Sequence, residues 1–259
     1  MLKRFFSQAW LYQKGRTAAF KLPEFLCFDA GYPVITLIFY CLLAAYSFRT
    51  RDLSRWVIGN AFLMCTNTCV FGLGNLFRSE RYSGRLRSIV AAPCSKLAVV
   101  LSGGVFPTLF AAVAVALGFL VGALIFGVDF SGVPLGYAAL TILCAMASAT
   151  CFGLLLSVFG LITDSMNMVL NVVSYLLMLF TGAEFPVAQL PAAGRVLSRL
   201  LPLTRAMEAM SLLFGEGRGS FGRLLLGELA VAGAYALLAW AIFGLADRIC
   251  RRRGKLDLY

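Results

Sequence analysis

The stretch LAVVLSGGVFPTLFAAVAVALGFLVGALIF, residues 97–126, contains no charged side chain. A helix needs about 20 apolar residues to cross the roughly 30 Å hydrocarbon layer of a bilayer, so this stretch predicts a transmembrane helix. The chain as a whole is also strongly apolar. Of its 259 residues, 60% are hydrophobic and 14% are charged, and the mean hydropathy is +0.85. Soluble domains are closer to half apolar and a quarter charged. The composition therefore predicts an all-α, polytopic membrane protein.

Five further apolar ranges are each expected to form a span. They lie near 31–48, 56–77, 134–160, 165–182 and 223–246. No internal repeat or low-complexity linker separates them, so we expect residues 1–259 to form one membrane domain of about six transmembrane helices. In the span at 97–126, Gly118 and Gly122 form a G-x-x-x-G pattern, which permits close helix approach. We expect this pattern to pack helices within one subunit.

Residues 1–30 lack the apolar core and the small-residue cleavage site of a signal peptide. Leu2, Phe5, Phe6 and Ala9 instead share one helical face, with Trp10 beside it. This pattern favours an N-terminal helix lying in the membrane interface, and a solvated tail is the alternative.

The basic residues predict the orientation in the membrane. Five Lys or Arg fall in each of 1–30, 78–96 and 248–255, against three in 49–55 and five in the longer 183–223. Cytoplasmic segments carry the excess of positive charge, so we expect both termini and residues 78–96 on the cytoplasmic side. Topology and anionic lipid then account for the net charge of +11 without a nucleic-acid partner.

Residues 78–96, RSERYSGRLRSIVAAPCSK, place a dense group of charges between two apolar spans. Arginine is costly in hydrocarbon, which keeps residues 78–88 at or beyond the lipid headgroups. A positive-inside anchor loop explains this charge without any partner. A docking surface for another protein is the second interpretation, because Gly84 leaves close access and Leu86 belongs to a partly apolar face.

Within this loop, Glu80-Arg81-x-x-Gly84-x-Leu86 is followed by Ala91-Ala92-Pro93. The order resembles the cytoplasmic loop of ABC-2 type permeases, the membrane subunits of many ATP-driven exporters, where a coupling helix docks into a groove of the ATP-binding subunit. The resemblance implies an ATPase-coupling role for residues 78–92 and the following proline. The implied coupling residues are Glu80, Arg81, Gly84, Arg85, Leu86, Arg87 and Pro93. Arg85 and Arg87 stand where the family usually has Thr and Glu, which predicts an unusually acidic groove on the partner.

A second group of motifs lies in residues 183–222, on the opposite predicted side. Phe185-Pro186, Leu190-Pro191 and Pro202-Leu203-Thr204 follow the order of the family's external region between spans five and six. The prolines divide the region into short pieces with apolar residues opposite charged ones, so we expect short interfacial or re-entrant helices there. By the resemblance, Glu184, Phe185, Pro186 and Pro202 belong to an external gate segment.

Polar side chains recur along one face of two spans. In span five Asn167, Asn171 and Ser174 share a helical stripe, and in span two Asn60 and Asn67 lie seven residues apart. Hydrogen bonding between helices is one explanation, at about 0.6 kcal/mol per bond. The other is a translocation pathway lined by these five residues, which the resemblance implies because spans two and five line the family's conduit.

The sequence has no histidine and no G-x-x-x-x-G-K-[ST] phosphate loop. Without histidine, the chain cannot form a Ser-His-Asp triad and lacks the commonest metal ligand. Without the phosphate loop, it lacks the usual ATP-binding motif. Cys65 and Cys69, like Cys144 and Cys151, share a helical face but form no C-x-x-C motif. We expect no catalytic residue, no metal site and no cofactor bound by this chain.

With the resemblance, these features predict the membrane subunit of an ABC exporter in a bacterial inner membrane. ATP and Mg²⁺ would be bound by a separate ATP-binding subunit, and a second copy of the chain or a related permease would complete the pathway. The substrate would be a lipid, a drug-like molecule, a peptide or a glycan. The alternative is an ion-coupled secondary transporter or a channel-like protein without an ATPase partner. It would favour inverted repeats and ionisable residues at mid-bilayer, and we find neither in the sequence.

Overall fold

A computed structural model of the protein describes Ser7, Trp10 and residues 31–50, 52–82, 84, 96–163, 165–215 and 219–253. Within these residues every regular element is helical, which confirms the predicted all-α class. The elements are α3 (Tyr32–Phe48), α4 (Ser54–Cys65), the π-helical turn η2 (Thr66–Phe71), α5 (Gly72–Gly74), α6 (Leu76–Tyr82), α8 (Lys96–Phe126), α9 (Leu135–Ile162), α10 (Met166–Phe180), the 3-10 turn η3 (Val187–Gln189), α11 (Ala192–Leu200), α12 (Thr204–Leu213) and α13 (Phe221–Arg253).

Within the described residues, four helices are long and apolar enough to cross a membrane. They are Ser54–Gly74, Leu101–Phe126, Leu135–Gly160 and Phe221–Leu245. Two shorter apolar helices, α3 and α10, have 17 and 15 residues, or about 22–26 Å at the helical rise per residue. All six coincide with ranges predicted from the sequence, and the chain is a multi-pass membrane protein.

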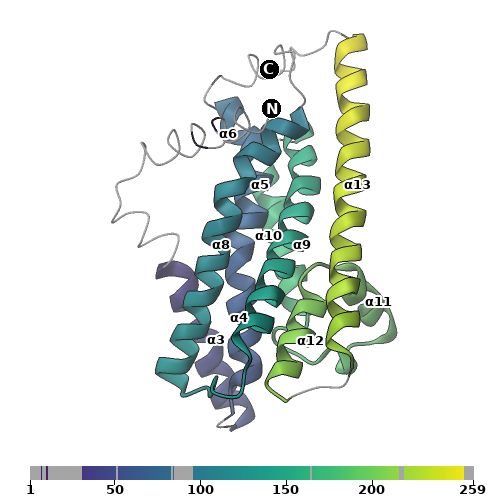
Figure 1. Ribbon diagram of the computed structural model, residues 1–259. Helices are drawn as coiled ribbons and strands as arrows, with labels where there is room; N and C mark the ends of the chain where they lie inside the picture. The colour runs from purple at the N-terminus through teal and green to yellow at the C-terminus, as the bar shows by residue number, and fades with distance from the viewer. Residues whose placement is uncertain are drawn as a thin grey trace.

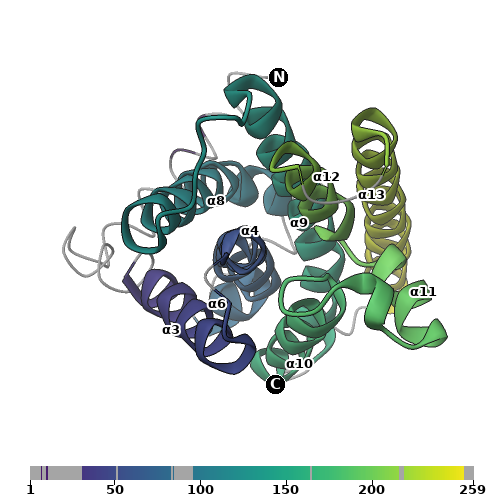
Figure 2. The same cartoon turned by 90° about the horizontal axis from the view of Figure 1, so that it is seen from below.

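The rod formed by α4, η2 and α5 stands at the centre of the bundle. Figure 2 shows α3, α8, α9 and α10 arranged around it. The rod is 82% buried over its apolar window, whereas α13 is 22% buried. A Cβ added at Gly118 would lie 2.8 Å from the Met64 sulphur, and one at Gly122 would lie 2.2 Å from a Val57 methyl carbon. The G-x-x-x-G pattern therefore packs α8 against α4 within one subunit, as predicted.

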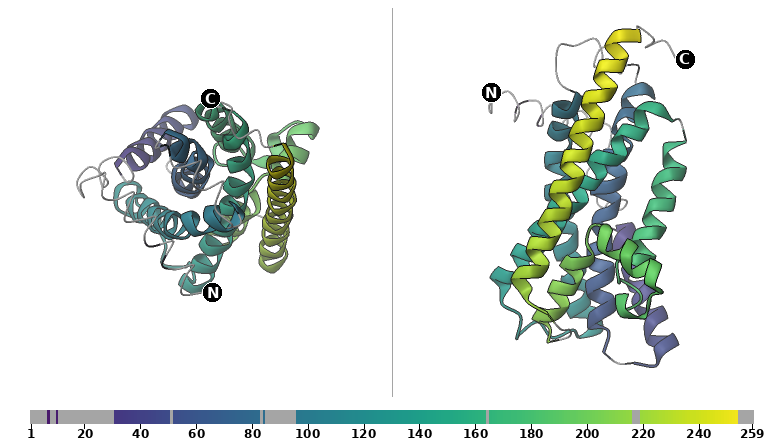
Figure 3. Two further views of the ribbon diagram at one scale, coloured as in Figure 1. Left: turned by 90° about the horizontal axis from the view of Figure 1, so that it is seen from above. Right: turned by 90° about the vertical axis from the view of Figure 1, so that its right-hand side faces the viewer.

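The bundle has two different ends. One end, here called the α6 end, carries α6 and the C-terminal end of α13 (Figure 1). The other, the α12 end, carries α12 and the connections from α3 to α4 and from α8 to α9. α13 packs along α9 and runs from one end to the other (Figure 3). The basic residues at 78–81 and 248–253 therefore share the α6 end, as the predicted topology requires.

Parts of two predicted features lie outside the described residues. These are residues 1–30 apart from Ser7 and Trp10, and the coupling residues Arg85, Leu86, Arg87 and Pro93. Ser7 and Trp10 are helical, and the Trp10 ring centre lies 5.7 Å from that of Phe106 on α8. The interfacial helix over residues 1–30 stays a prediction.

Short helices fill the region between α10 and α13, where the prolines predict them. α11 leaves Val196 and Leu200 exposed, as an interfacial helix would. α12 instead buries Ala206, Met207 and Met210, and it packs on α4, α9 and α13. The two helices have similar patterns in the sequence because an apolar face looks the same whether it contacts lipid or protein.

Candidate functional site

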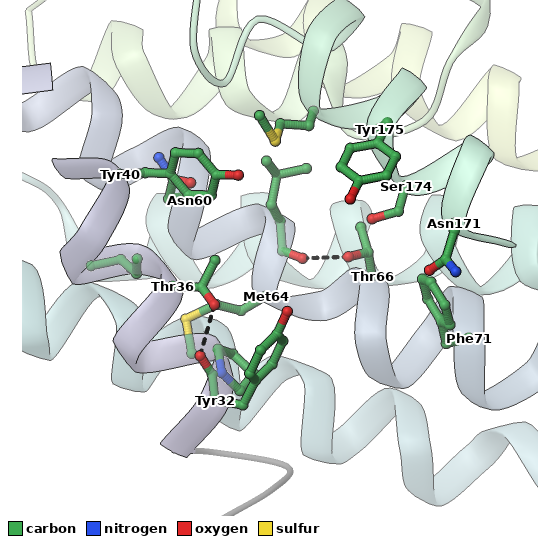
Figure 4. A pocket seen from close by; sticks show the side chains of 14 residues that line it. Tyr32, Thr36, Tyr40, Asn60, Met64, Thr66, Phe71, Asn171, Ser174 and Tyr175 are labelled. Atoms are coloured by element: carbon green, nitrogen blue, oxygen red, sulfur yellow. Dashed lines mark hydrogen bonds between the residues drawn. The ribbon is translucent and has the colours of Figure 1, made fainter. Parts of the chain in front are cut away.

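A cleft opens between α3, the α4–η2 rod and α10 (Figure 4). Its volume is about 350 Å³, within the roughly 300–1,000 Å³ of small-molecule sites. Eight of the 14 lining side chains carry a hydroxyl or an amide. They are Tyr32, Thr36, Tyr40, Asn60, Thr66, Asn171, Ser174 and Tyr175. The cleft is therefore a polar surface on a bundle whose outer faces expose many large apolar side chains.

Three of the five residues predicted to line a pathway meet in this cleft. Asn60 comes from α4, and Asn171 and Ser174 come from α10. Asn167 lies one turn before Asn171, is exposed and is not among the lining residues. Asn67 lies in η2, and its side chain is outside the described part of the structure. The polar faces of spans two and five thus meet over part of their length.

The π-helical turn η2 interrupts the central rod beside the cleft. Thr66 donates its hydroxyl proton to the Leu63 carbonyl at 2.7 Å, and Thr68 donates to the Cys65 carbonyl at 3.2 Å. Such side-chain bonds compete with the regular helical pattern, and π-turns recur at functional sites. Thr66 and Phe71, the first and last residues of η2, both line the cleft.

The hydrogen-bond donors of several lining residues are already used within their own helices. Thr36 donates to the Tyr32 carbonyl at 2.9 Å, and the Asn60 amide donates to the Trp56 carbonyl at 3.0 Å. The Thr66 hydroxyl is bonded in the same way. A hydroxyl has one proton and two lone pairs, and an amide oxygen has two lone pairs. These side chains therefore keep acceptor capacity and little donor capacity.

Glu184 lies at the end of the cleft nearest α12, in the turn between α10 and η3. The turn comes close to α4 at Gly59, which has no side chain. A Cβ added at Gly59 would lie only 2.5 Å from the Ala183 Cα. The next residue, Glu184, is thereby held beside Asn60. Burial raises the pKa of the Glu184 carboxyl above its ordinary value, and the Asn60 amide counteracts part of this shift. Glu184 Oε1 is buried, and no group in the described part of the chain hydrogen-bonds to it.

The other residues predicted for an external gate are spread along the same region. Phe185 is 43% exposed and Pro186 is half-buried, directly after Glu184. Pro202 is buried in the turn before α12. Of these four residues, we relate Glu184 to the cleft, because it lies beside the lining residue Asn60.

At the α6 end, the described coupling residues lie in α6 and the turn that follows. Glu80 is only 3% exposed, and the Arg78 guanidinium lies 5.3 Å from the Tyr82 ring centre. Gly84 is exposed with φ +69°, and a Cβ added there would meet nothing within 4 Å. The backbone conformation therefore favours glycine at this position, because other residues avoid the left-handed region.

Glu228 is a functional candidate that the sequence reading missed. It is fully buried in α13, about two turns or 10 Å from the start of that helix. Its carboxylate accepts hydrogen bonds from the Ser148 hydroxyl of α9 and from the Leu203 backbone N–H, the latter at 2.7 Å. Leu203 has φ +73°, an unusual conformation for a branched side chain. Glu228 thus fixes the turn before α12 against α13.

The sequence does carry a signal for Glu228. The available signal was a lone carboxylate in the apolar stretch LLLGELAVAGAYALL, residues 224–238, since intramembrane charges mark sites with specific partners. Its partners here are a backbone amide and a serine. The Tyr235 hydroxyl adds a bond to the Leu200 carbonyl at 2.7 Å, so α13 holds residues 200–203 at two points.

The cysteines in the described helices are largely buried. Within the described ranges, no three His, Cys, Asp or Glu side chains come close enough together to hold a metal ion.

Comparison with known proteins gives one result. A family model described as "ABC-2 type transporter" matches residues 29–214, a range that includes the cleft, α6 and the helices up to α12. A search of curated proteins finds no match.

Proposed function

The chain belongs to the ABC-2 type transporter family, and from this premise we infer that it is the membrane subunit of an ATP-driven exporter. Proteins of this family are permeases that generally work with an ATP-binding subunit and often dimerise. We propose that this chain moves an amphipathic molecule out of the cytoplasm of a bacterial cell, with both termini on the cytoplasmic side.

The observation that carries the proposal is the polar cleft between α3, the central rod and α10. Amides are costly in hydrocarbon, yet Asn167 and Asn171 are exposed on α10. A water-filled pathway and a second membrane subunit in front of this face would remove that cost. In our proposal two permease subunits, identical or related, face each other across the cleft.

The α6 end supplies the surface for the ATP-binding subunits in this proposal. Its basic residues lie on α6 and at the end of α13, and Gly84 places an exposed turn after α6. ATP and Mg²⁺ bind to the partner. Closure of two ATP-binding subunits around ATP moves residues 78–92, and the cleft opens towards the α12 end.

The experiment is co-purification of the tagged chain with a Walker-motif ATPase encoded beside its gene, followed by ATP hydrolysis in proteoliposomes. We expect a stable complex whose hydrolysis depends on the permease. Gly84→Val should lower that hydrolysis several-fold, because a β-branched residue is strained at φ +69°. Gly84→Asn should retain it, because Asn tolerates the left-handed region.

Gly127→Val is the matched control, since Gly127 also has a positive φ of +64° and open surroundings but lies at the α12 end. It introduces the same kind of strain far from the proposed docking surface and should leave ATP hydrolysis unchanged. Absence of a complex, or equal effects of the valines at 84 and 127, would overturn the proposed coupling.

A further inference from the structure

The side chains that line the cleft carry no formal charge. None of its 14 lining residues is Lys, Arg, Asp or Glu, although the chain carries 23 Lys and Arg and a net charge of +11. A site for an anionic ligand needs cationic or N–H donor groups directed at the ligand. Three of the eight polar lining side chains, Thr36, Asn60 and Thr66, use a donor within their own helix, and their oxygens keep lone pairs for a ligand.

Four aromatic rings complete the lining. Tyr32 and Tyr40 come from α3, Phe71 from η2 and Tyr175 from α10, and Figure 4 shows them on different sides of the same cleft. The face of an aromatic ring is electron-rich and attracts an organic cation within about 6 Å of the ring centre. The rings also provide apolar surface for the hydrophobic part of such a ligand.

Glu184 is not one of the lining residues, but it places a carboxyl group beside Asn60, which lines the cleft. The close contact between Gly59 and Ala183 fixes its position beside Asn60. Its Oε1 is buried without a hydrogen-bond partner in the described part of the chain, so a cation bound nearby would compensate its charge electrostatically.

We propose that the cleft binds an amphipathic organic cation, with the charge near Glu184 and the apolar part against the tyrosine and phenylalanine rings. The volume of about 350 Å³ suits a molecule of drug size. This inference rests on the proposed function, in which the cleft is the substrate pathway, and it names the class of substrate.

The test measures equilibrium binding of tetraphenylphosphonium to the purified full chain in lipid nanodiscs, with empty nanodiscs as blank. Tetraphenylborate has nearly the same shape and the opposite charge, so it controls for simple partitioning into lipid. We expect saturable binding of the cation and none of the anion. Glu184→Gln should weaken cation binding about ten-fold, as expected for one lost, partly desolvated charge pair.

Two further variants separate the site from general effects. Asp129→Asn removes an exposed carboxylate from the α8–α9 connection, which also lies at the α12 end, and Asp129 does not line the cleft, so binding should stay unchanged. Tyr175→Leu should weaken binding about five-fold, whereas Tyr175→Phe keeps the ring and should retain it. Equal binding of both tetraphenyl ions, no saturable binding, or unchanged affinity in Glu184→Gln would each overturn the proposal.

These outcomes are independent of the ATPase. Binding is measured on the chain alone, so a failure to find an ATP-binding partner leaves the cation result intact. Conversely, a permease that couples to its ATPase but does not bind tetraphenylphosphonium would keep the proposed function and lose this substrate class.

Discussion

Glu228→Ala is expected to lower the free energy of unfolding by about 2–4 kcal/mol. The substitution removes two charge-assisted hydrogen bonds, to Ser148 and to the Leu203 N–H, each worth about 1.5–3 kcal/mol. Part of this loss is offset because the buried carboxylate, whose Oε2 lacks a hydrogen-bond partner among the described residues, no longer has to be desolvated. The Leu203 N–H is left buried without its acceptor, so the turn before α12 should open locally.

The assay combines unfolding in mixed micelles with hydrogen exchange of the peptide that contains Leu203. We expect faster exchange at this peptide in Glu228→Ala. Glu228→Gln keeps an acceptor oxygen and should cost about 1 kcal/mol. Ser148→Ala removes one bond and leaves that to Leu203, so it should lower stability without changing exchange there. Unchanged exchange in Glu228→Ala, or an equal loss of stability in the alanine and glutamine variants, would refute the reasoning.

Two further predictions concern the edge of the cleft. Burial raises the pKa of Glu184 above its ordinary value of 4.5, so the folded state binds the proton more tightly and stability falls as pH rises from about that value through the folded pKa. Glu184→Gln should therefore raise stability at pH 7 by about 1 kcal/mol and lose this advantage near pH 4, as thermal melts at both pH values would show. Gly59→Ala places a Cβ 2.5 Å from the Ala183 Cα, so it should cost about 1–3 kcal/mol and weaken tetraphenylphosphonium binding. Gly233→Ala on α13, with open space around it, should do neither.

Much of the fold follows from patterns along the chain. Six apolar ranges coincide with helices, and for the four longest the thickness of a bilayer explains the length. Gly118 and Gly122 indicate a close helix contact because only a missing side chain permits it. The different surroundings of α11 and α12 cannot be predicted from these patterns. The spacing of apolar residues shows which face of a helix is buried, but it does not show whether lipid or protein covers that face.

The candidate site shows the same limit more sharply. A stripe of polar residues predicts that α10 has a special face, yet Asn171 lines the cleft and Asn167 does not. Which α10 residue lines the cleft depends on how α3 and η2 are placed against α10. The spacing of residues within one helix does not encode that placement. Glu228 is bonded to a backbone amide 25 residues away in sequence, so no pairing of charged side chains points to it. Thr36, Asn60 and Thr66 offer the cleft mainly acceptors, because protons of these side chains bond to carbonyls of their own helix. Residue type alone would have counted these three side chains equally as donors and acceptors.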